Sequence, residues 1–434
     1  MLNITINLSP TGNSDGLYRY KDGAWTIYNR DDFPALRGRD EVRGNFDDQA
    51  DYVGVAVDEA NDKVWVGTYY EGAFSINRTT DEIEVFDESD SSLGVAVGEA
   101  PGRVRVGKIA VDAAGNTYFA NALSDTGRPV SVRSPDGQWV GLGGECDRNE
   151  AFAVEVDEAG FIWLLHGINA GGGVTVIDPG ADLFDPSDDV CRLFTTSNSE
   201  LPVNEVRSLA LDLEGDIWIG TSQGVMVFDC GAATISSASC DGREIVVEDE
   251  IGNTGLLLET EDCFAITIDG ANRKWVGTGG GAYLLSQDGR DQLAFFDEDN
   301  SPLLDNFVRD IAINPNNGTV YFGTEDGITS YRGEATSAGT INRENLIVFP
   351  NPVEPGYDGV IAIEGVSRNA TIKITDLSGK LVFETEALGG QVLWDGADYN
   401  GRRVQSGVYL VFASTNGIRF ENPDAAVGKI VFIR

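Results

Sequence analysis

The fold is decided by the stretch VRSLALDLEGDIWIGTSQGVMV, residues 206–227. It consists of an alternating strand that ends in Asp212, a turn, a second strand that carries Trp218 and ends in a Gly-Thr pair, and a third strand that opens at Gly224. An aspartate can close a turn onto its own backbone, and glycine adopts the positive φ that tight turns require. The stretch therefore predicts three consecutive antiparallel strands joined by hairpin turns.

The same pattern recurs along the first three quarters of the chain. Clear copies surround Trp65 and Trp275, one copy has Tyr321 in place of tryptophan, and weaker copies surround Tyr118 and Trp163. The first strands of the six units end at Asp58, Asp112, Asp157, Asp212, Asp269 and Asn314, which are 54, 45, 55, 57 and 45 residues apart. Periods of about 40–50 residues are typical of four-stranded propeller blades. We expect these six side chains to be structural rather than catalytic.

The two ends of this region share a further pattern. Residues 16–26 read like the outer half of a blade and are similar to residues 327–333. An open propeller leaves unpaired strand edges, so a composite blade shared between the ends is expected to close it. The prediction is an all-β, seven-bladed β-propeller over residues 1–340, with six blades closed by an N-terminal strand as the alternative.

A second domain is predicted after a short linker at residues 341–346. Residues 347–434 contain short alternating strands separated by turns. Turn signals about every 8–12 residues over about ninety residues are typical of a small Ig-like β-sandwich.

The charge of the chain limits its partners. With 31 Lys and Arg, 70 Asp and Glu, and one His, the net charge at pH 7 is −39. This excludes a nucleic-acid binder that depends on phosphate neutralisation. An anionic ligand would require a local basic patch, and arginine is the side chain best suited to read phosphate. The candidate ligand-binding residues form three groups: Arg37, Arg39 and Arg43; Arg103 and Arg105; Arg402 and Arg403. Offsetting neighbouring carboxylates is the alternative role for each group.

Export is suggested by the cysteines alone. No apolar stretch is long enough for a membrane-spanning helix, and residues 1–5 lack the features of an export signal. The five cysteines have no CxxC spacing, so no metal site is predicted. Disulfides Cys230–Cys240 and Cys146–Cys191, with Cys263 left over, are one interpretation, and buried free thiols are the other.

No catalytic group or cofactor site is predicted. His166 is the only histidine and ends a predicted strand, so we expect a structural role for it. The glycine runs 171–173 and 279–281 fall at turns and match no phosphate-binding motif. Asp395, Asp398 and Asn400 could bind Ca²⁺, although a hydrogen-bonded hairpin loop is favoured. The long insertion 230–263 is either a binding loop or an extension without a function of its own.

Motif residues of the last segment carry a resemblance to a known family. They are Pro350, Asn351, Pro352, Gly379, Asp395, Gly407, Tyr409 and Lys429. With the intervening Trp394 and the order in which they occur, the segment resembles the type A C-terminal sorting domain of the Bacteroidetes type IX secretion system. The preceding repeats resemble the two-component-regulator propeller family, whose functions are mixed.

Together these resemblances imply a non-catalytic surface component of the outer-membrane attachment complex. Its implied partners are the sortase PorU, with PorV and PorQ, and its implied ligand is anionic lipopolysaccharide, which it would supply to the sortase. The resemblance also implies that its sorting domain is retained and that this chain corresponds to a second propeller plus that domain. The alternatives are a secreted propeller cargo that binds or degrades polysaccharide, and a sensor domain, against which the sorting domain argues.

Overall fold

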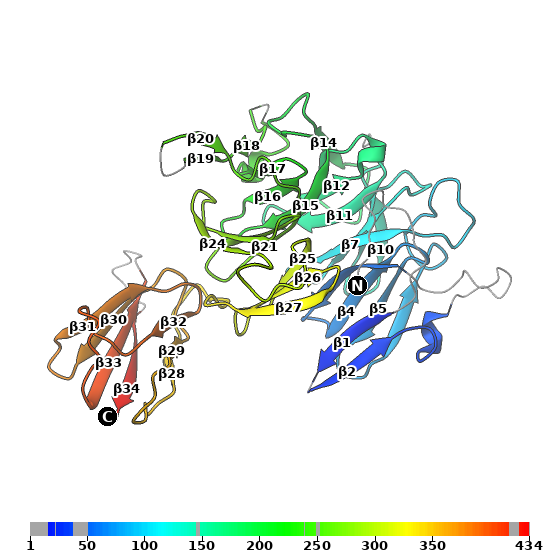
Figure 1. Cartoon of the computed structure of the whole chain (residues 1–434). Coiled ribbons are helices and arrows are strands. Elements are labelled where there is room, and N and C mark those ends of the chain that lie inside the picture. The colour runs from blue at the N-terminus through cyan, green and yellow to red at the C-terminus, as the bar shows by residue number, and fades with distance from the viewer. Residues whose placement is uncertain are drawn as a thin grey trace. The chain divides into compact units, whose positions relative to one another are not determined.

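The computed structural model describes residues 16–21, 23–37, 51–144, 148–237, 239–248, 252–415 and 425–433. These residues form β-strands and three short 3-10 helices, at Pro34–Leu36, Ile168–Ala170 and Gly231–Ala233 (Figure 1). The chain divides into two compact units, Met1–Ile266 and Thr267–Arg434. Within the described ranges, no helix is long and apolar enough to cross a membrane.

Four antiparallel four-stranded sheets follow one another in the described part of the first unit. In each sheet the strands pair in chain order, which is an up-and-down meander. The strands are β3 (Tyr52–Asp58), β4 (Lys63–Thr68), β5 (Ala73–Asn77) and β6 (Ile83–Phe86); β7 (Val106–Val111), β8 (Thr117–Asn121), β9 (Val130–Arg133) and β10 (Trp139–Leu142); β11 (Ala151–Val156), β12 (Ile162–His166), β13 (Val174–Asp178) and β14 (Val190–Phe194); β15 (Val206–Leu211), β16 (Ile217–Thr221), β17 (Gly224–Phe228) and β18 (Arg243–Glu244).

Two hairpins complete the first unit. The first pairs β1 (Leu17–Lys21) with β2 (Ala24–Tyr28), and the second pairs β19 (Val246–Glu248) with β20 (Thr254–Leu256) inside the long insertion. Tyr28 is buried against Phe74 and Ile76 of β5, which holds the first hairpin on the neighbouring sheet.

A fifth four-stranded sheet of the same kind begins with β21 (Cys263–Ile268), in which the boundary between the units falls. It continues with β22 (Lys274–Thr278), β23 (Ala282–Leu285) and β24 (Gln292–Phe296). The next sheet has three described strands, β25 (Val308–Ile313), β26 (Thr319–Thr324) and β27 (Gly327–Arg332). The fold is therefore all-β and built from repeated antiparallel sheets, as a β-propeller is.

The aspartates that end the first strands are structural. In Asp157, Oδ1 accepts hydrogen bonds from the backbone of Ala159 and Phe161, and Oδ2 accepts one of 2.9 Å from the indole of Trp163. Asp212 repeats the pattern, with Trp218 at 3.0 Å. The carboxylate thus fixes both the turn and the buried aromatic ring of the second strand, which confirms the expected structural role.

The Gly-Thr pair that ends the second strands has two separate purposes. Thr221 donates its hydroxyl to the carbonyl of Gly224 at 3.0 Å, which ties the next turn. The glycine before the threonine permits close packing of sheets, because a Cβ on Gly67 would collide with the backbone of Gly107 in β7. In the second unit, a Cβ on Gly277 would lie 2.9 Å from the carbonyl oxygen of Val308 in β25.

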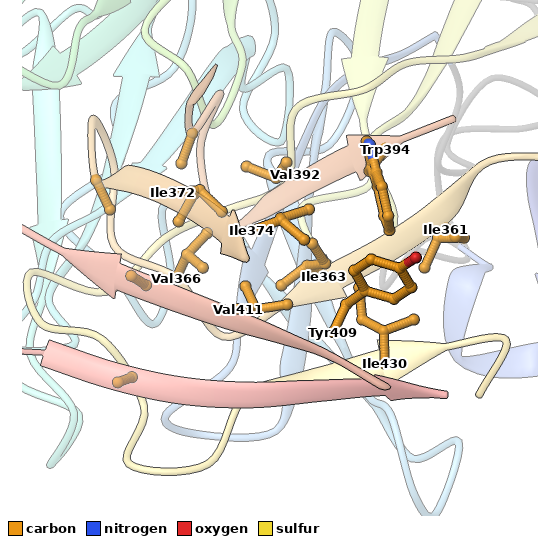
Figure 2. Close-up of a cluster of buried hydrophobic side chains, with 14 of the residues drawn as sticks. Ile361, Ile363, Val366, Ile372, Ile374, Val392, Trp394, Tyr409, Val411 and Ile430 are labelled. Atoms are coloured by element: carbon orange, nitrogen blue, oxygen red, sulfur yellow. The ribbon is translucent and has the colours of Figure 1, made fainter. Parts of the chain in front are cut away.

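The last part of the second unit contains two further sheets. One has β28 (Ile347–Phe349), β29 (Ile361–Glu364) and β32 (Gln391–Trp394), and the other has β31 (Leu381–Glu386), β30 (Thr371–Asp376), β33 (Gly407–Ser414) and β34 (Ala425–Phe432) in that spatial order. Residues of both sheets face one buried core, as Figure 2 shows for Ile363, Ile374, Trp394 and Val411. Alternate residues of β33 and β34 are buried, which is the pattern of a strand with one face in a core.

Residues 334–337, which precede the predicted linker, are well packed. Ser337 N–H donates to Pro315 O at 2.8 Å, and Gly390 N–H donates to Thr336 O at 2.9 Å. Gln391 reaches Glu334 O at 2.6 Å. After β27 the chain therefore passes the turn that follows β25 and makes hydrogen bonds to the start of β32. The proposed boundary at residues 341–346 stays a prediction.

Cys230 and Cys240 form a disulfide, which confirms the first predicted pair. Cys191 is also disulfide-bonded, and Cys146, its predicted partner, lies outside the described residues. Cys263 is a buried free thiol, as expected of the residue left over.

Candidate functional site

Two of the three predicted arginine groups are poor candidates for a ligand site. The described members of these groups that make hydrogen bonds donate them to nearby backbone carbonyls, and two members lie outside the described residues. Arg37 donates its Nε to Arg30 O at 3.0 Å, while Arg39 and Arg43 lie outside the described residues. Arg403 donates to the carbonyls of Asp395 and Tyr357 and lies 5.3 Å from the ring centre of Phe432. Arg402 is exposed beside it.

The remaining pair, Arg103 and Arg105, leads into β7. Val104 and Val106 between and after them are fully buried, so the two arginines share the opposite face of an extended segment. The segment is held rigidly, because Gly72 N–H donates to Val104 O and Ala122 N–H donates to Arg105 O, both at 2.9 Å. The structure thus brings these two predicted residues together on a fixed backbone.

A side chain beside each of these two guanidinium groups limits its position. Arg103 lies 4.6 Å from the ring centre of Tyr70, and Arg105 forms an ion pair of 3.0 Å with Glu99. The Glu99 side chain is 44% exposed. An ion pair with so exposed a partner contributes little, about 0–1 kcal/mol, so an anionic ligand could replace Glu99 at Arg105.

A buried polar layer lies behind Arg105. Tyr69 is buried against Val53, Ala122 and Phe152, and its hydroxyl has no hydrogen-bond partner among the described residues. Burial raises the pKa of the Tyr69 phenol, with Glu150 adding to the rise and Arg105 opposing it. Burial also raises the pKa of Glu150, against the backbone N–H of Ala170 and the charge of Arg105.

His166 belongs to the same region and is fully buried at the end of β12. Its Nε2 lies 2.9 Å from the hydroxyl of Thr175. Burial, with a smaller effect of Arg148, lowers the pKa of His166 to about 3, so the ring is neutral at physiological pH. Arg148 in turn lies against Gly171, where a Cβ would be 2.7 Å from its Nη2. The glycine run is thus a turn, as expected, and leaves room for this guanidinium.

Other arginines near the starts of the first strands are already neutralised. Arg207 makes a two-pronged ion pair with Asp262, at 2.6 and 2.8 Å, and reaches Glu205 at 3.0 Å. The charge of Arg207 is therefore satisfied within the chain.

Sequence reasoning missed Tyr69, Arg148 and Glu150. A signal for Glu150 was present, because a charged residue directly precedes each first strand of the first unit: Asp51, Arg105, Glu150, Glu205 and Asp262. No periodic signal marks Tyr69 or Arg148, which come from different turns.

The possible Ca²⁺ ligands form turns instead. Asp398 Oδ1 accepts from the backbone of Asn400 and Arg402, and Asp395 Oδ1 accepts from Ala397. No group of three or more metal-ligating side chains gathers anywhere in the part of the chain that the structure describes. The favoured hairpin-loop interpretation agrees with these bonds.

Asn351 of the sorting-domain motif bridges the edge of β34. Its side chain donates to Lys429 O at 2.7 Å and accepts from Val431 N–H at 2.9 Å. The peptide bonds before Pro350 and Pro352 are cis.

Other motif residues lie at strand ends and turns of the two sheets that share this core. Tyr409 donates its hydroxyl to Gln405 O at 2.9 Å, and Gly407 opens β33. Gly379 has φ +83° in the turn between β30 and β31, a conformation that favours glycine.

A cavity of 640 Å³ lies between β14 and the loop closed by the Cys230–Cys240 disulfide. Its lining is rich in hydroxyl groups and includes Arg192, Ser197, Asn198 and Ser237. Arg192 is committed to Thr234 O, Ser237 O and Asp241. Arg192 therefore holds the Cys230–Cys240 loop and is not a free cation in this cavity.

The repeated four-stranded sheets place the chain among all-β proteins with a propeller-like architecture, and solved structures agree. The extracellular domain of a hybrid two-component system from B. thetaiotaomicron matches 98% of this chain and 55% of its own, at 14% identity and a TM-score of 0.50. That similarity concerns the fold alone.

A more specific similarity is to PorZ, described as an essential bacterial surface component of the type-IX secretion system of Porphyromonas gingivalis. The match covers 98% of this chain, with 25% identity and a TM-score of 0.65. This chain spans 56% of the PorZ chain. No family model and no curated protein matches the sequence.

Proposed function

We propose that this protein is a non-catalytic, outer-membrane-associated surface component of a type IX secretion system. In this role it binds anionic lipopolysaccharide and delivers it to the sortase of the attachment complex, with PorU, PorV and PorQ as partners. The single observation that carries the proposal is the match to PorZ over nearly the whole chain at 25% identity.

The proposal includes a seven-bladed propeller, with six blades as the alternative, and an Ig-like sorting domain. Five four-stranded sheets and one three-stranded sheet among the described strands from β3 to β27 support six units. The β1–β2 hairpin supports an outer half-blade beyond them. Two sheets around a single core support the Ig-like sandwich.

We assign the lipopolysaccharide phosphates to Arg103 and Arg105. Both side chains stand on one face of a backbone that is fixed by β7 and its neighbours. A guanidinium presents a planar fork that matches two phosphate oxygens, and Tyr70 beneath Arg103 offers a flat surface to a sugar ring.

Calorimetry of the full chain with purified phosphorylated lipopolysaccharide tests this assignment. Saturable binding is expected, with neutral, phosphate-free lipopolysaccharide binding at least about tenfold more weakly. Arg105→Ala should weaken binding about tenfold, and Arg105→Lys should also weaken it because the fork is lost while the charge stays.

Arg290→Ala is the matched control, because Arg290 is exposed and its only acidic partner in the described structure, Asp288, is 3.8 Å away. Equal effects of the Arg105 and Arg290 substitutions would contradict the assignment of the site. No difference between phosphorylated and neutral lipopolysaccharide would contradict the proposed ligand.

A further inference from the structure

The outer edge of β27, the third strand of its sheet, has no described strand paired with it, unlike the third strand of each earlier sheet. In the sheets that begin with β3, β7, β11, β15 and β21, a fourth strand covers the third. Among the described residues, β27 pairs only with β26. The chain after β27 does not cover this edge, because Gly333 N–H donates to Gly318 O at 3.0 Å and leads away toward the turn after β25.

A groove lies beside the open edge. It has a volume of 500 Å³ and is lined by the aromatic rings of Phe295, Phe296, Phe322 and Tyr331, together with residues 300–303 and Thr329. Ile328 of β27 is 68% exposed and Tyr331 is 40% exposed. An exposed apolar edge of this kind is a ready template for another strand.

An earlier pair of sheets shows what normally fills this position. Trp65 of β4, Phe86 of β6 and Phe119 of β8 form an aromatic cluster, with Trp65 5.6 Å from Phe86 and 5.4 Å from Phe119. The fourth member is Trp139, on the fourth strand β10, which lies 5.5 Å from Phe86 and 5.2 Å from Phe119.

The corresponding cluster in the second unit has only the first three members. Trp275, Phe296 and Phe322 occupy the same places in their strands and lie 5.7 to 6.0 Å apart. No described fourth strand supplies a ring like Trp139, and Tyr331 of the third strand leans over Phe296 at 5.0 Å instead. The groove is the space that the fourth strand and its aromatic side chain would fill.

The rim of the groove is acidic. Glu298 and Asp299 are exposed directly before the lining residues 300–303, and Asp326 is exposed in the turn before β27. Glu325 is neutralised by Arg309, and Arg332 is the exposed cation at the far end of the strand. A basic segment therefore suits the rim, and an aromatic side chain suits the groove.

We propose that β27 docks an extended segment of a partner protein, which adds as a fourth strand, inserts an aromatic side chain beside Phe296 and Phe322, and carries lysine or arginine at the end that lies beside Asp326. Main-chain hydrogen bonds along β27 would supply affinity, and the aromatic pocket would supply specificity. The inference does not depend on the lipopolysaccharide site.

The test uses a fluorescent peptide with the sequence of residues 137–142, which include Trp139 of β10, followed by two lysines at its C-terminal end, the end that lies beside Asp326 when the peptide pairs antiparallel with β27. It is titrated with the full chain and followed by anisotropy. The parent peptide should bind at least about tenfold more tightly than a Trp139→Ser peptide or a peptide with two glutamates in place of the lysines. Amide exchange in residues 327–332 should slow when it binds.

Thr329→Trp fills the groove and should abolish binding, whereas Leu377→Trp places the same side chain on an exposed turn of the sandwich and should have no effect. Equal binding of the tryptophan and serine peptides, or unchanged exchange in β27, would overturn the proposal. Binding that emerges only after removal of residues 1–15 would assign the edge to this chain itself and would also overturn it.

Discussion

The two oxygens of Asp157 have different partners, and this division explains why an aspartate recurs in five of the six units. Oδ1 holds the turn through Ala159 and Phe161, and Oδ2 holds the indole of Trp163. Tyr118 takes the place of the indole at Asp112, with its hydroxyl at 2.9 Å. The repeated aspartate therefore couples the hairpin register to the aromatic core of each sheet.

Replacement of this aspartate tests the coupling. Asp157→Ala leaves a buried indole N–H and two backbone N–H groups without an acceptor, so we expect the free energy of unfolding to fall by about 3 kcal/mol. Asp398→Ala removes the same kind of turn at an exposed site without an indole and should cost clearly less. Urea unfolding measures both, and equal losses would contradict a role for the indole bond.

His166 makes stability depend on pH in a defined direction. The pKa of the ring is about 3 in the folded protein and is ordinarily 6.5. Between these values the unfolded chain binds a proton that the folded protein does not, so protons favour unfolding. The contribution to stability is complete above pH 6.5 and is lost progressively as the pH falls toward 3.

We therefore expect His166→Gln to remove part of the acid sensitivity. Between pH 7 and pH 5 the wild-type protein should lose about 2 kcal/mol of stability relative to the variant. Groups such as Glu150 and Arg148 are present in both proteins, so their own titration cancels to first order. Chemical denaturation at each pH gives the comparison, and parallel pH profiles would show that His166 is not buried as a neutral ring.

At the scale of elements, the glycines of the second strands set how closely neighbouring sheets pack. Gly67 lies against the backbone of Gly107, whereas Gly323, at the same place in β26, has its nearest atom 3.6 Å from an added Cβ. Gly67→Ala should destabilise the protein by about 2–3 kcal/mol through overpacking. Gly323→Ala should be neutral or stabilising by up to about 1 kcal/mol. Thermal unfolding of the two variants gives the contrast, and similar melting temperatures would contradict it.

The sequence predicted the repeating elements well because each unit carries its own local signals. Asp212, Trp218 and the Gly-Thr pair lie within a short stretch, so the turn, the buried ring and the hairpin follow from neighbours in the chain. The Cys230–Cys240 pair was also predictable, because its two cysteines are close in sequence.

The candidate site was predictable only in part, because its residues come from separate turns. Arg103 and Arg105 were found as a local pair, but the buried Tyr69 and Glu150 behind them come from other parts of the chain, and no periodic signal marks Tyr69. The open edge of β27 was not visible either, because a strand's missing partner leaves no mark on the strand's own sequence. These features follow from packing between units rather than from the pattern within one.

At the scale of the whole molecule, the net charge of −39 opposes an anionic ligand until it reaches Arg103 and Arg105. Salt shortens the Debye length from about 30 Å at 0.01 M to about 8 Å at 0.15 M. The association rate with phosphorylated lipopolysaccharide should therefore rise over this range, because long-range repulsion is screened. Stopped-flow fluorescence measures this rate, and a rate that falls with added salt would contradict repulsion by the bulk surface.

The central claim is that the protein is a resident component of the secretion apparatus and not one of its cargoes. The most direct measurement is mass spectrometry of the mature protein released from the surface of the source cells. The account predicts that peptides of the sandwich are retained, including residues 425–432 of β34, in molecules that also contain the propeller sheets. A mature surface protein that ends before residue 347 and carries a glycolipid at its new C-terminus would contradict the account and identify a cargo.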